Sequence, residues 1–228
     1  MAAFSYNTYK KYRAAVRQRY TGKDETSTGV LVTERENFMA DDWKQAWQPM
    51  IDAVGTDFSD GAEVQGADEV ERGAIRRFLE PLEFDCPLHY DRAVATAYGY
   101  SDILAPYSSI MTWTIPPLWY PGTHIFTSAE RNAQPAHNPL SGVRTNLAPP
   151  TTGFFATDIE IDYLKPVVAG DRLSRVGWTL ISCAPKETSV GRGAFMTWES
   201  EVRNQRGDVV ARTRTGTYSY NPHASQSD

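Results

Sequence analysis

Cysteine is almost absent from this sequence, since the 228 residues include only Cys86 and Cys183, which lie far apart in dissimilar contexts. Their separation matches no paired zinc or redox motif, so we expect two buried free thiols in a reducing compartment. The sequence also lacks any run of about 18 apolar residues, and its first residues do not show the charged-then-apolar pattern of a secretory signal. We therefore expect a cytoplasmic protein with no membrane association.

Basic residues are not in excess either. The 23 lysines and arginines are outnumbered by 28 acidic residues, which gives a net charge of -5. No basic stripe is present that would neutralise phosphates, so a nucleic-acid partner is not expected. None of the four histidines has metal-ligand spacing to a second histidine, a cysteine or a carboxylate. Without a Gly-x-Ser-x-Gly motif or a phosphate loop, we expect no cofactor, no serine hydrolase and no nucleotide enzyme.

The chain has enough apolar residues, 41%, for one substantial core. We expect a helical extension over residues 1–60, a main domain over 61–221 and a short tail over 222–228. In the extension, a basic helical piece is expected over 10–20. A second helix follows, in which apolar side chains recur at helical spacing from Trp43 to Val54. Exposed tryptophans would be costly, so this second helix should dock on the main domain or on a partner subunit.

The main domain is expected to be α+β, with helices upstream and strands downstream. A helix over 71–79 should be halted by Pro81, and Asp91 is well placed to cap a short helix. The apolar helix from Tyr107 to Ile115 is the best candidate to cover the inner face of a sheet. A long loop is expected over 120–150. Alternating apolar and polar residues predict antiparallel strands over residues 62–70, 157–164, 173–183, 195–203 and 209–218.

The nine residues from Glu83 to Asp91, EFDCPLHYD, combine three carboxylates with the first histidine of the chain. An imidazole titrates near neutral pH, so His89 could exchange a proton with water if Asp85 or Glu83 oriented it. The plain alternative is that Asp85 caps a helix and His89 binds a backbone carbonyl. The composition of this segment leaves both interpretations open.

Several blocks of residues resemble the MaoC-like acyl dehydratases, which include the (R)-specific enoyl-CoA hydratases. The closest likeness is to the N-terminal dehydratase region that also occurs in fatty acid synthases. It covers roughly residues 45–220. The blocks are Arg72 to Phe78, Pro87-Leu88-His89, Ala105-Pro106, Asp158 to Val167 and Gly170-Asp171.

This resemblance implies a hot-dog fold, an antiparallel sheet wrapped around one central helix, over residues 61–221. It also implies a dimer or a paired double hot-dog that acts on acyl thioesters of coenzyme A or a carrier protein. Such enzymes add water across the 2,3 double bond or remove it. The partners expected are therefore the thioester and a second chain, either a copy of this one or another MaoC-like chain.

The catalytic motif of the family is matched only in part. Pro87, Leu88 and His89 are in place, but Phe84 stands where the family has its catalytic aspartate. Cys86 stands where asparagine is expected, and Glu83 where glycine is expected. Asp85 or Glu83 would then have to take the vacant acid role beside His89. The missing aspartate keeps a second possibility open, a non-catalytic subunit whose partner owns the full pair, and a third, an acyl-CoA binding or thioesterase-like protein.

The substrate-binding residues are expected at the start of the central helix. The resemblance implies that backbone amides there polarise the thioester carbonyl, and we expect those of Tyr107 and Ser108 to do so. The remaining candidates are Pro106, Ser109 and Tyr90, the last as a possible lining of the acyl site. The plain alternative is an ordinary helix start with a proline near its first turn and a capping serine.

Overall fold

The computed structural model describes residues 43–126, 128–133, 135 and 145–223. The basic helix expected over 10–20 lies outside the described residues. Trp43 begins a compact unit that contains all the elements described below. No helix in the described ranges is long and apolar enough to cross a membrane.

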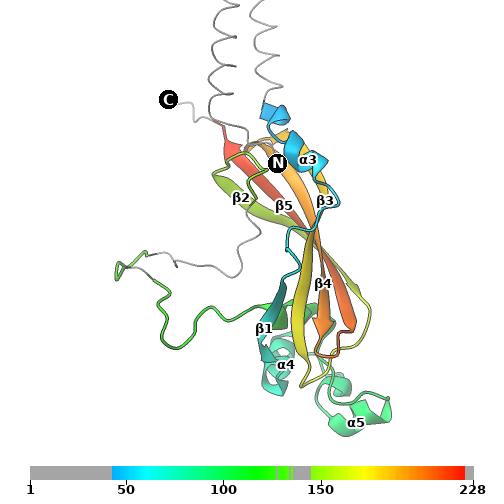
Figure 1. The fold of residues 1–228 in the computed structure, drawn as a ribbon. Coiled ribbons are helices and arrows are strands. Elements are labelled where there is room, and N and C mark those ends of the chain that lie inside the picture. Colours follow the sequence, from blue (N-terminus) through cyan, green and yellow to red (C-terminus); the bar gives the residue numbers. More distant parts are fainter. Residues whose placement is uncertain (1–42, 127, 134, 136–144, 224–228) are drawn as a thin grey trace, which may run out of the picture. The chain divides into compact units, whose positions relative to one another are not determined.

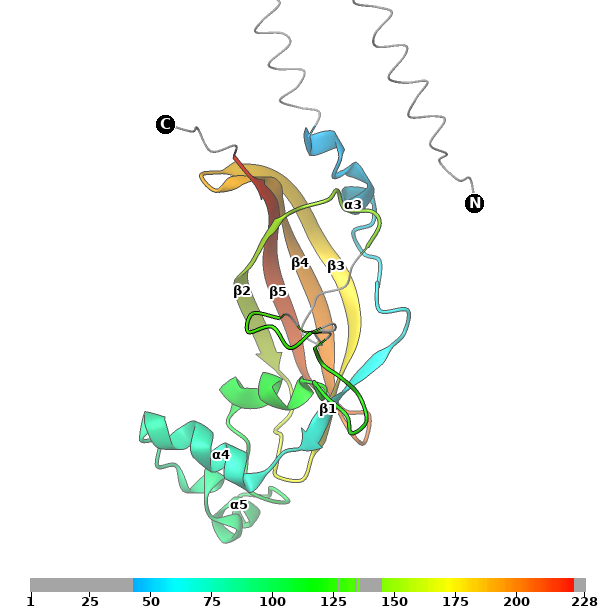
Figure 2. The same ribbon diagram turned by 90° about the vertical axis from the view of Figure 1, so that its left-hand side faces the viewer.

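The described part of the chain contains a five-stranded antiparallel sheet in the order β1-β3-β4-β5-β2 (Figures 1 and 2). All five expected strands are present, and the α+β prediction is confirmed. The central strands run well beyond the segments that periodicity predicted, because their ends form hairpins in which backbone pairing continues. The strands are β1 (Glu63–Glu69), β2 (Gly153–Tyr163), β3 (Arg172–Thr188), β4 (Gly191–Asn204) and β5 (Val209–Pro222).

The helices are short, and all of those in the described residues lie upstream of the four long strands β2 to β5, as expected. Asp91 caps α5 as expected, because its side chain accepts hydrogen bonds from the amides of Ala93 and Val94. The expected apolar helix is present as a 3-10 helix, η3. The helical elements are α3 (Gln48–Asp52), α4 (Arg72–Leu79), η1 (Glu80–Leu82), η2 (Pro87–His89), α5 (Arg92–Ala97) and η3 (Tyr107–Thr114).

η3 packs against β1 and β3 on one face of the sheet, which we call the inner face. The contact with β1 is close because Gly66 has no side chain. A β-carbon there would overlap the carbonyl oxygen of Trp113 and lie 2.9 Å from its carbonyl carbon. The amide of Ala67 also donates to the carbonyl of Ile115, at 2.9 Å. Ile110 and Trp113 of η3 belong to the larger of the two core clusters, together with residues of α4, β3, β4 and β5.

The second core cluster lies under α3. Trp47 and Met50 are 2% and 0% exposed and pack with Leu180, Met196 and Trp198 of the sheet. The expected docking of this helix on the main domain is therefore confirmed. The helix is not continuous as predicted, because a turn at residues 46–47 separates residues 43–45 from α3. Proline lies in the first turn of α3, where its missing N–H is tolerated but would interrupt a longer helix.

The opposite, outer face of the sheet carries paired charges in its middle. Arg214 lies 2.9 Å from Glu199, and Arg212 lies 3.5 Å from Glu201. β2 is an edge strand. Its alternating sequence is typical of a half-buried strand, but most of its side chains are exposed. Ile159 and Tyr163, which face the inner side, are 55% and 41% exposed, because the described residues do not cover the inner face at this edge.

Candidate active site

His89 ends the one-turn helix η2, and its partly buried ring lies against the residues that lead into η3. Its Nδ1 is 2.8 Å from the carbonyl oxygen of Leu104. A carbonyl can only accept a hydrogen bond, so Nδ1 must carry the proton. In the neutral ring, Nε2 then has the free lone pair. This hydrogen bond therefore selects the tautomer in which Nε2 can act as a base.

The backbone around Leu104 explains why the ring is held there. The amide of Leu104 donates to the carbonyl of Leu88 at 2.9 Å, so the η2 segment and residues 103–105 lie side by side. On their other side, the amide of Ala105 donates to Val167 at 2.9 Å, and the amide of Ala169 donates to Ile103 at 3.0 Å. Residues 103–105 are thus held between the His89 segment and the loop that enters β3.

No carboxylate among the described residues reaches His89. Glu83 and Asp85 are both exposed, and in the described residues neither side chain lies within ion-pair distance of the ring. Glu83 has a φ of 49°, so the chain turns sharply just before the segment that was expected to supply the acid. Asp85 does not cap a helix either, because η2 has no side-chain cap. The pairing of His89 with either acid is therefore not formed among the described residues of this protomer, and it remains a prediction.

Phe84 occupies the place next to the imidazole. Its ring centroid lies 5.6 Å from that of His89, at a tilt of 56°. The hydroxyl of Tyr90 donates to the carbonyl of Phe84 at 2.7 Å and so holds this backbone in place. Tyr90 is 43% exposed, which leaves its ring available at the surface beside the histidine. An apolar ring therefore stands where the family pattern has a carboxylate.

The start of η3 presents free backbone donors close to this histidine. The amides of Tyr107 and Ser108 have no acceptor among the residues described. Tyr107 comes three residues after Leu104, whose carbonyl binds the imidazole, and three residues of chain span about 10 Å at most. The ring of Tyr107 packs on that of Tyr163, with 5.0 Å between centroids. An imidazole and two orphan amides are therefore within reach of one small acyl group.

Pro106 and Ser109 serve the helix start itself. Pro106 is buried with extended backbone angles, and its carbonyl accepts hydrogen bonds from the amide and the hydroxyl of Ser109, at 3.0 and 2.7 Å. Ser109 is only 2% exposed. The hydroxyl of Ser109 is therefore engaged inside the protein, as in the plain alternative of an ordinary helix start.

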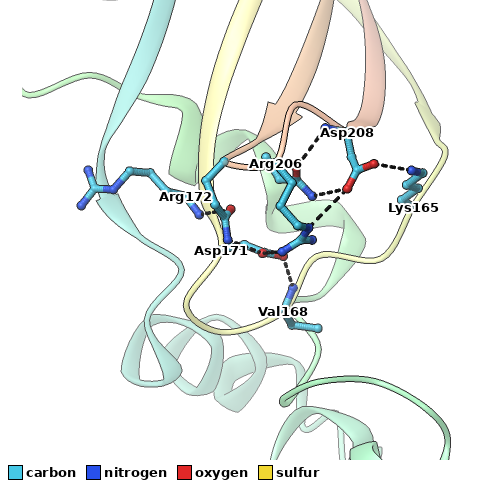
Figure 3. A network of polar contacts seen from close by, with 8 residues as sticks. Lys165, Val168, Asp171, Arg172, Arg206 and Asp208 are labelled. Atoms are coloured by element: carbon cyan, nitrogen blue, oxygen red, sulfur yellow. Dashed lines mark hydrogen bonds and ion pairs between the residues drawn. The ribbon is translucent and has the colours of Figure 1, made fainter.

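Asp171, a buried carboxylate that was not predicted as a site residue, holds the loop that binds residues 103–105 (Figure 3). Asp171 is 2% exposed, and its Oδ2 accepts a hydrogen bond from the amide of Val168 at 3.0 Å. Its Oδ1 accepts from Gln205 at 3.1 Å and from Arg206 at 3.2 Å. Asp171 thus ties the loop before β3, which supports residues 103–105, to the turn between β4 and β5.

A second carboxylate continues this network, as Figure 3 shows. Lys165 contacts Asp208 at 2.6 Å, and Arg206 contacts it at 3.3 Å. The hydrogen bond from Lys165, with a further one from Asn204, lowers the pKa of Asp208 to about 2. The sequence at Gly170-Asp171 indicates a turn but not the hydrogen-bond partners of the Asp171 carboxylate. The partners in the β4–β5 turn are more than 30 residues away, so only the folded chain brings them together.

A curled antiparallel sheet with a short helix against its inner face, and a histidine segment at the start of that helix, is the arrangement of a MaoC-like hot-dog protein. The chain belongs to the family described as FAS1-like, dehydratase domain region, whose model matches residues 53–213. The expected family is thereby confirmed.

Individual relatives agree with this assignment. The chain is 29% identical over 164 residues to the probable enoyl-CoA hydratase alpha subunit of Thermomonospora curvata, and this match covers 71% of the chain. The matched region spans about half, 48%, of the length of that relative.

Among solved structures, the ChsH1-ChsH2 complex of Mycobacterium tuberculosis has a chain that matches with a TM-score of 0.53 and 22% identity. That match covers 83% of this chain and 97% of the other, and it supports the hot-dog fold. A MaoC-like dehydratase from Rhodospirillum rubrum matches with a TM-score of 0.46 and 22% identity, over 75% of this chain and all of the other.

Proposed function

We propose that this chain is part of an acyl-thioester hydratase or dehydratase, which adds water across the 2,3 double bond of an enoyl-CoA or acyl-carrier substrate, or removes it. The cytoplasmic location expected from the sequence belongs to the same proposal. The observation that carries it is the hydrogen bond from His89 Nδ1 to Leu104, close to the free amides of Tyr107 and Ser108. It leaves Nε2 as a base beside two donors that can bind a developing enolate oxygen.

Each group has one step in this reaction. Nε2 of His89 takes a proton from water as the water oxygen bonds to C3, and the electron pair of the double bond moves toward the thioester oxygen. The amides of Tyr107 and Ser108 stabilise that oxygen as it becomes negative. Protonation of C2 then completes hydration, either by the imidazolium or by a separate acid. In dehydration the same groups work in the reverse order.

We propose further that the acid comes from a second hot-dog chain. The described part of this protomer offers no carboxylate to His89, and Phe84 stands in the family's aspartate position. The relative from Thermomonospora curvata is named as an alpha subunit, and the mycobacterial structure is a complex of two chains. β2 also leaves apolar side chains exposed at the edge of the sheet, among them Ile159 and Tyr163. A homodimer and a heteromer with another MaoC-like chain are both open under this proposal.

The absence of a carboxylate favours one second candidate function. In this alternative the chain is a non-catalytic subunit that shapes the acyl site, while its partner carries a complete Asp/His pair. His89 then only holds the Leu104 backbone. The two functions differ in what the loss of the imidazole does to turnover.

A substitution that keeps the hydrogen bond but removes the base separates these candidates. In His89→Asn, the side-chain amide can still donate to Leu104 but cannot accept a proton from water. With crotonyl-CoA or a longer enoyl-CoA, we expect the loss of a general base to lower kcat by about a hundredfold or more. The protein would be assayed alone and co-expressed with a neighbouring MaoC-like chain. His223→Asn is a matched control, because His223 also binds a backbone carbonyl, that of Thr188, at the far end of the sheet.

Full activity of His89→Asn in an active complex would refute a catalytic His89 and favour the non-catalytic subunit. Release of free CoA without loss of the double bond would instead indicate a thioesterase. Light scattering tests the second chain separately, and a monomer at micromolar concentration would count against both candidates.

A further inference from the structure

Arg175 lies on the inner face of the sheet, where most side chains are apolar. It is paired in register with Val202, and cross-strand pairs point to the same side of a sheet. Val202 is fully buried in the cluster that contains Ile110 and Trp113 of η3. The side chain of Arg175 therefore leaves the strand on the side that η3 covers.

No acidic side chain in the described residues forms an ion pair with Arg175. The guanidinium lies over the ring of Trp178, 5.1 Å from its centroid, and makes no ion pair in the part of the chain that is described. It is half-buried, and burial lowers the pKa of Arg175. Among the described residues, the indole nitrogen of Trp178 is buried without a hydrogen-bond partner. The guanidinium nitrogens of Arg175 are not buried in this way, so a ligand can reach them.

Most arginines of this sheet have an acidic partner, although Arg172 of β3, which is also half-buried, makes no ion pair among the described residues either. On the outer face, Arg203, Arg212 and Arg214 each contact a glutamate of β4. Burial of a charge is costly unless it is paired, and folded proteins leave few buried polar groups unsatisfied. Stacking on an aromatic ring offsets only part of that cost. An unpaired arginine on this face is therefore able to bind a ligand that supplies acidic acceptors.

The position of Arg175 relative to the candidate active site can be read from the register. Tyr163 pairs with Ala211, Ala211 with Val202, and Val202 with Arg175. These are three strand spacings of about 4.8 Å, or about 14 Å along the sheet. Tyr163 contacts Tyr107 at the start of η3, where the thioester carbonyl would bind.

η3 runs in the same direction across this face. Its first residue contacts β2 through Tyr163, and Trp113 near its end contacts Gly66 of β1. Eight residues of 3-10 helix extend about 16 Å, which agrees with the distance along the sheet. An acyl group held at the start of η3 would therefore have to span about 14 Å to reach Arg175.

We propose that Arg175 binds an anionic oxygen group, such as a carboxylate, at the distal end of the acyl substrate. This inference rests on the proposed function, because it takes the thioester to lie at the start of η3. A guanidinium presents paired N–H donors that match a carboxylate, and such charge-assisted hydrogen bonds are about twice as strong as neutral ones. The substrate class is then an acyl thioester with an acidic group about 14 Å from its carbonyl.

Binding to two saturated thioesters tests this site without any need for turnover. One is an ω-carboxyacyl-CoA whose extended acyl chain spans about 14 Å. The other is the acyl-CoA of equal length without the carboxylate. Isothermal titration calorimetry on the full chain, in the complex in which it is purified, should show about tenfold or greater preference for the carboxylate.

Arg175→Gln should abolish this preference and leave the Kd of the plain acyl-CoA unchanged. Arg175→Lys should retain part of it, which guards against a variant that simply misfolds. Arg77→Gln is the matched control, since Arg77 is an exposed arginine of α4 without an ion pair, and it should keep the full preference.

The possible failures can be told apart. Equal affinity of the wild type for the two thioesters, or a preference that survives in Arg175→Gln, would overturn the Arg175 site alone. If neither thioester binds, the proposed function fails as well, and the Arg175 site fails with it.

Discussion

Replacement of Gly66 by alanine tests how η3 is seated on the sheet. The added methyl group would overlap the carbonyl oxygen of Trp113, and it would lie 2.9 Å from its carbonyl carbon and 3.2 Å from the carbonyl oxygen of Leu173. Carbon atoms in contact are normally about 3.5–4.0 Å apart, so the backbone at Trp113 must retreat by about 1 Å. No flexible side-chain end can yield instead, because the obstructing atoms belong to the backbone.

The energetic cost follows from what this shift disturbs. Forcing an extra methyl group into a packed core costs about 1–3 kcal/mol. The hydrogen bond from Ala67 to Ile115, 2.9 Å long, would be stretched, at a further cost of about 1 kcal/mol. Ile110 and Trp113, 1% and 5% exposed, would lose part of their packing. We therefore expect Gly66→Ala to lower the free energy of unfolding by about 3 kcal/mol.

Gly73→Ala provides a control of opposite sign. Gly73 lies in α4, and a β-carbon there would meet no atom within 4 Å. Alanine is favoured over glycine in a helix by up to about 1 kcal/mol, so this variant should be slightly more stable than the wild type. Urea unfolding followed by tryptophan fluorescence measures both changes. A Gly66→Ala protein as stable as the wild type would refute the close packing of η3 on β1.

Three further outcomes are expected from the network and the thiols. Lys165 holds the pKa of Asp208 near 2, below its ordinary value of 3.8. The ionised carboxylate of Asp208 therefore stabilises the fold fully above pH 3.8, and this contribution is lost as the pH falls toward 2. Asp208→Asn should accordingly lower the urea midpoint at pH 7 but not at pH 2. Asp171→Ala leaves the side-chain amide of Gln205 and the amide of Val168 without an acceptor among the described residues, and should cost about 3 kcal/mol in the same assay, whereas a loss below about 1 kcal/mol would contradict the buried contact. Burial raises the pKa of the Cys183 thiol to about 11, so iodoacetamide at pH 8 should label it slowly until urea unfolds the chain, as followed by mass spectrometry.

The strands and the capped helices could be predicted because their signals are local. Alternation in β3, β4 and β5 and the Asp91 cap depend only on neighbouring residues, and the structure has each of them. The conformation of η3 was less accessible. Its apolar composition indicated a buried helix but did not distinguish a 3-10 helix from an α-helix. The close approach of η3 to β1 shows in the sequence only as one glycine, at position 66.

The candidate site could be located in the sequence but not assembled from it. The segment around His89 and the start of η3 were identified, yet the partner of the imidazole is a carbonyl 15 residues away, which carries no residue-type signal. Asp171 and Arg175 were missed for a similar reason. Whether a charged residue in a strand or turn is paired depends on contacts between distant segments, and those are decided by the register of the whole sheet.

β2 carries one more consequence, for the behaviour of the isolated chain. Among the described residues, only one edge of this strand is hydrogen-bonded, to β5, and Phe154 and Ile159 are 64% and 55% exposed beside it. An open edge with exposed apolar side chains favours wrong pairing between copies, which natural sheets usually oppose with charges or prolines, and β2 has the charges of Asp158, Glu160 and Asp162. If a second chain covers this edge, as proposed above, a newly synthesised copy without that chain should be more prone to aggregation or degradation. The cellular amount of this protein would then follow the supply of the chain that covers the edge.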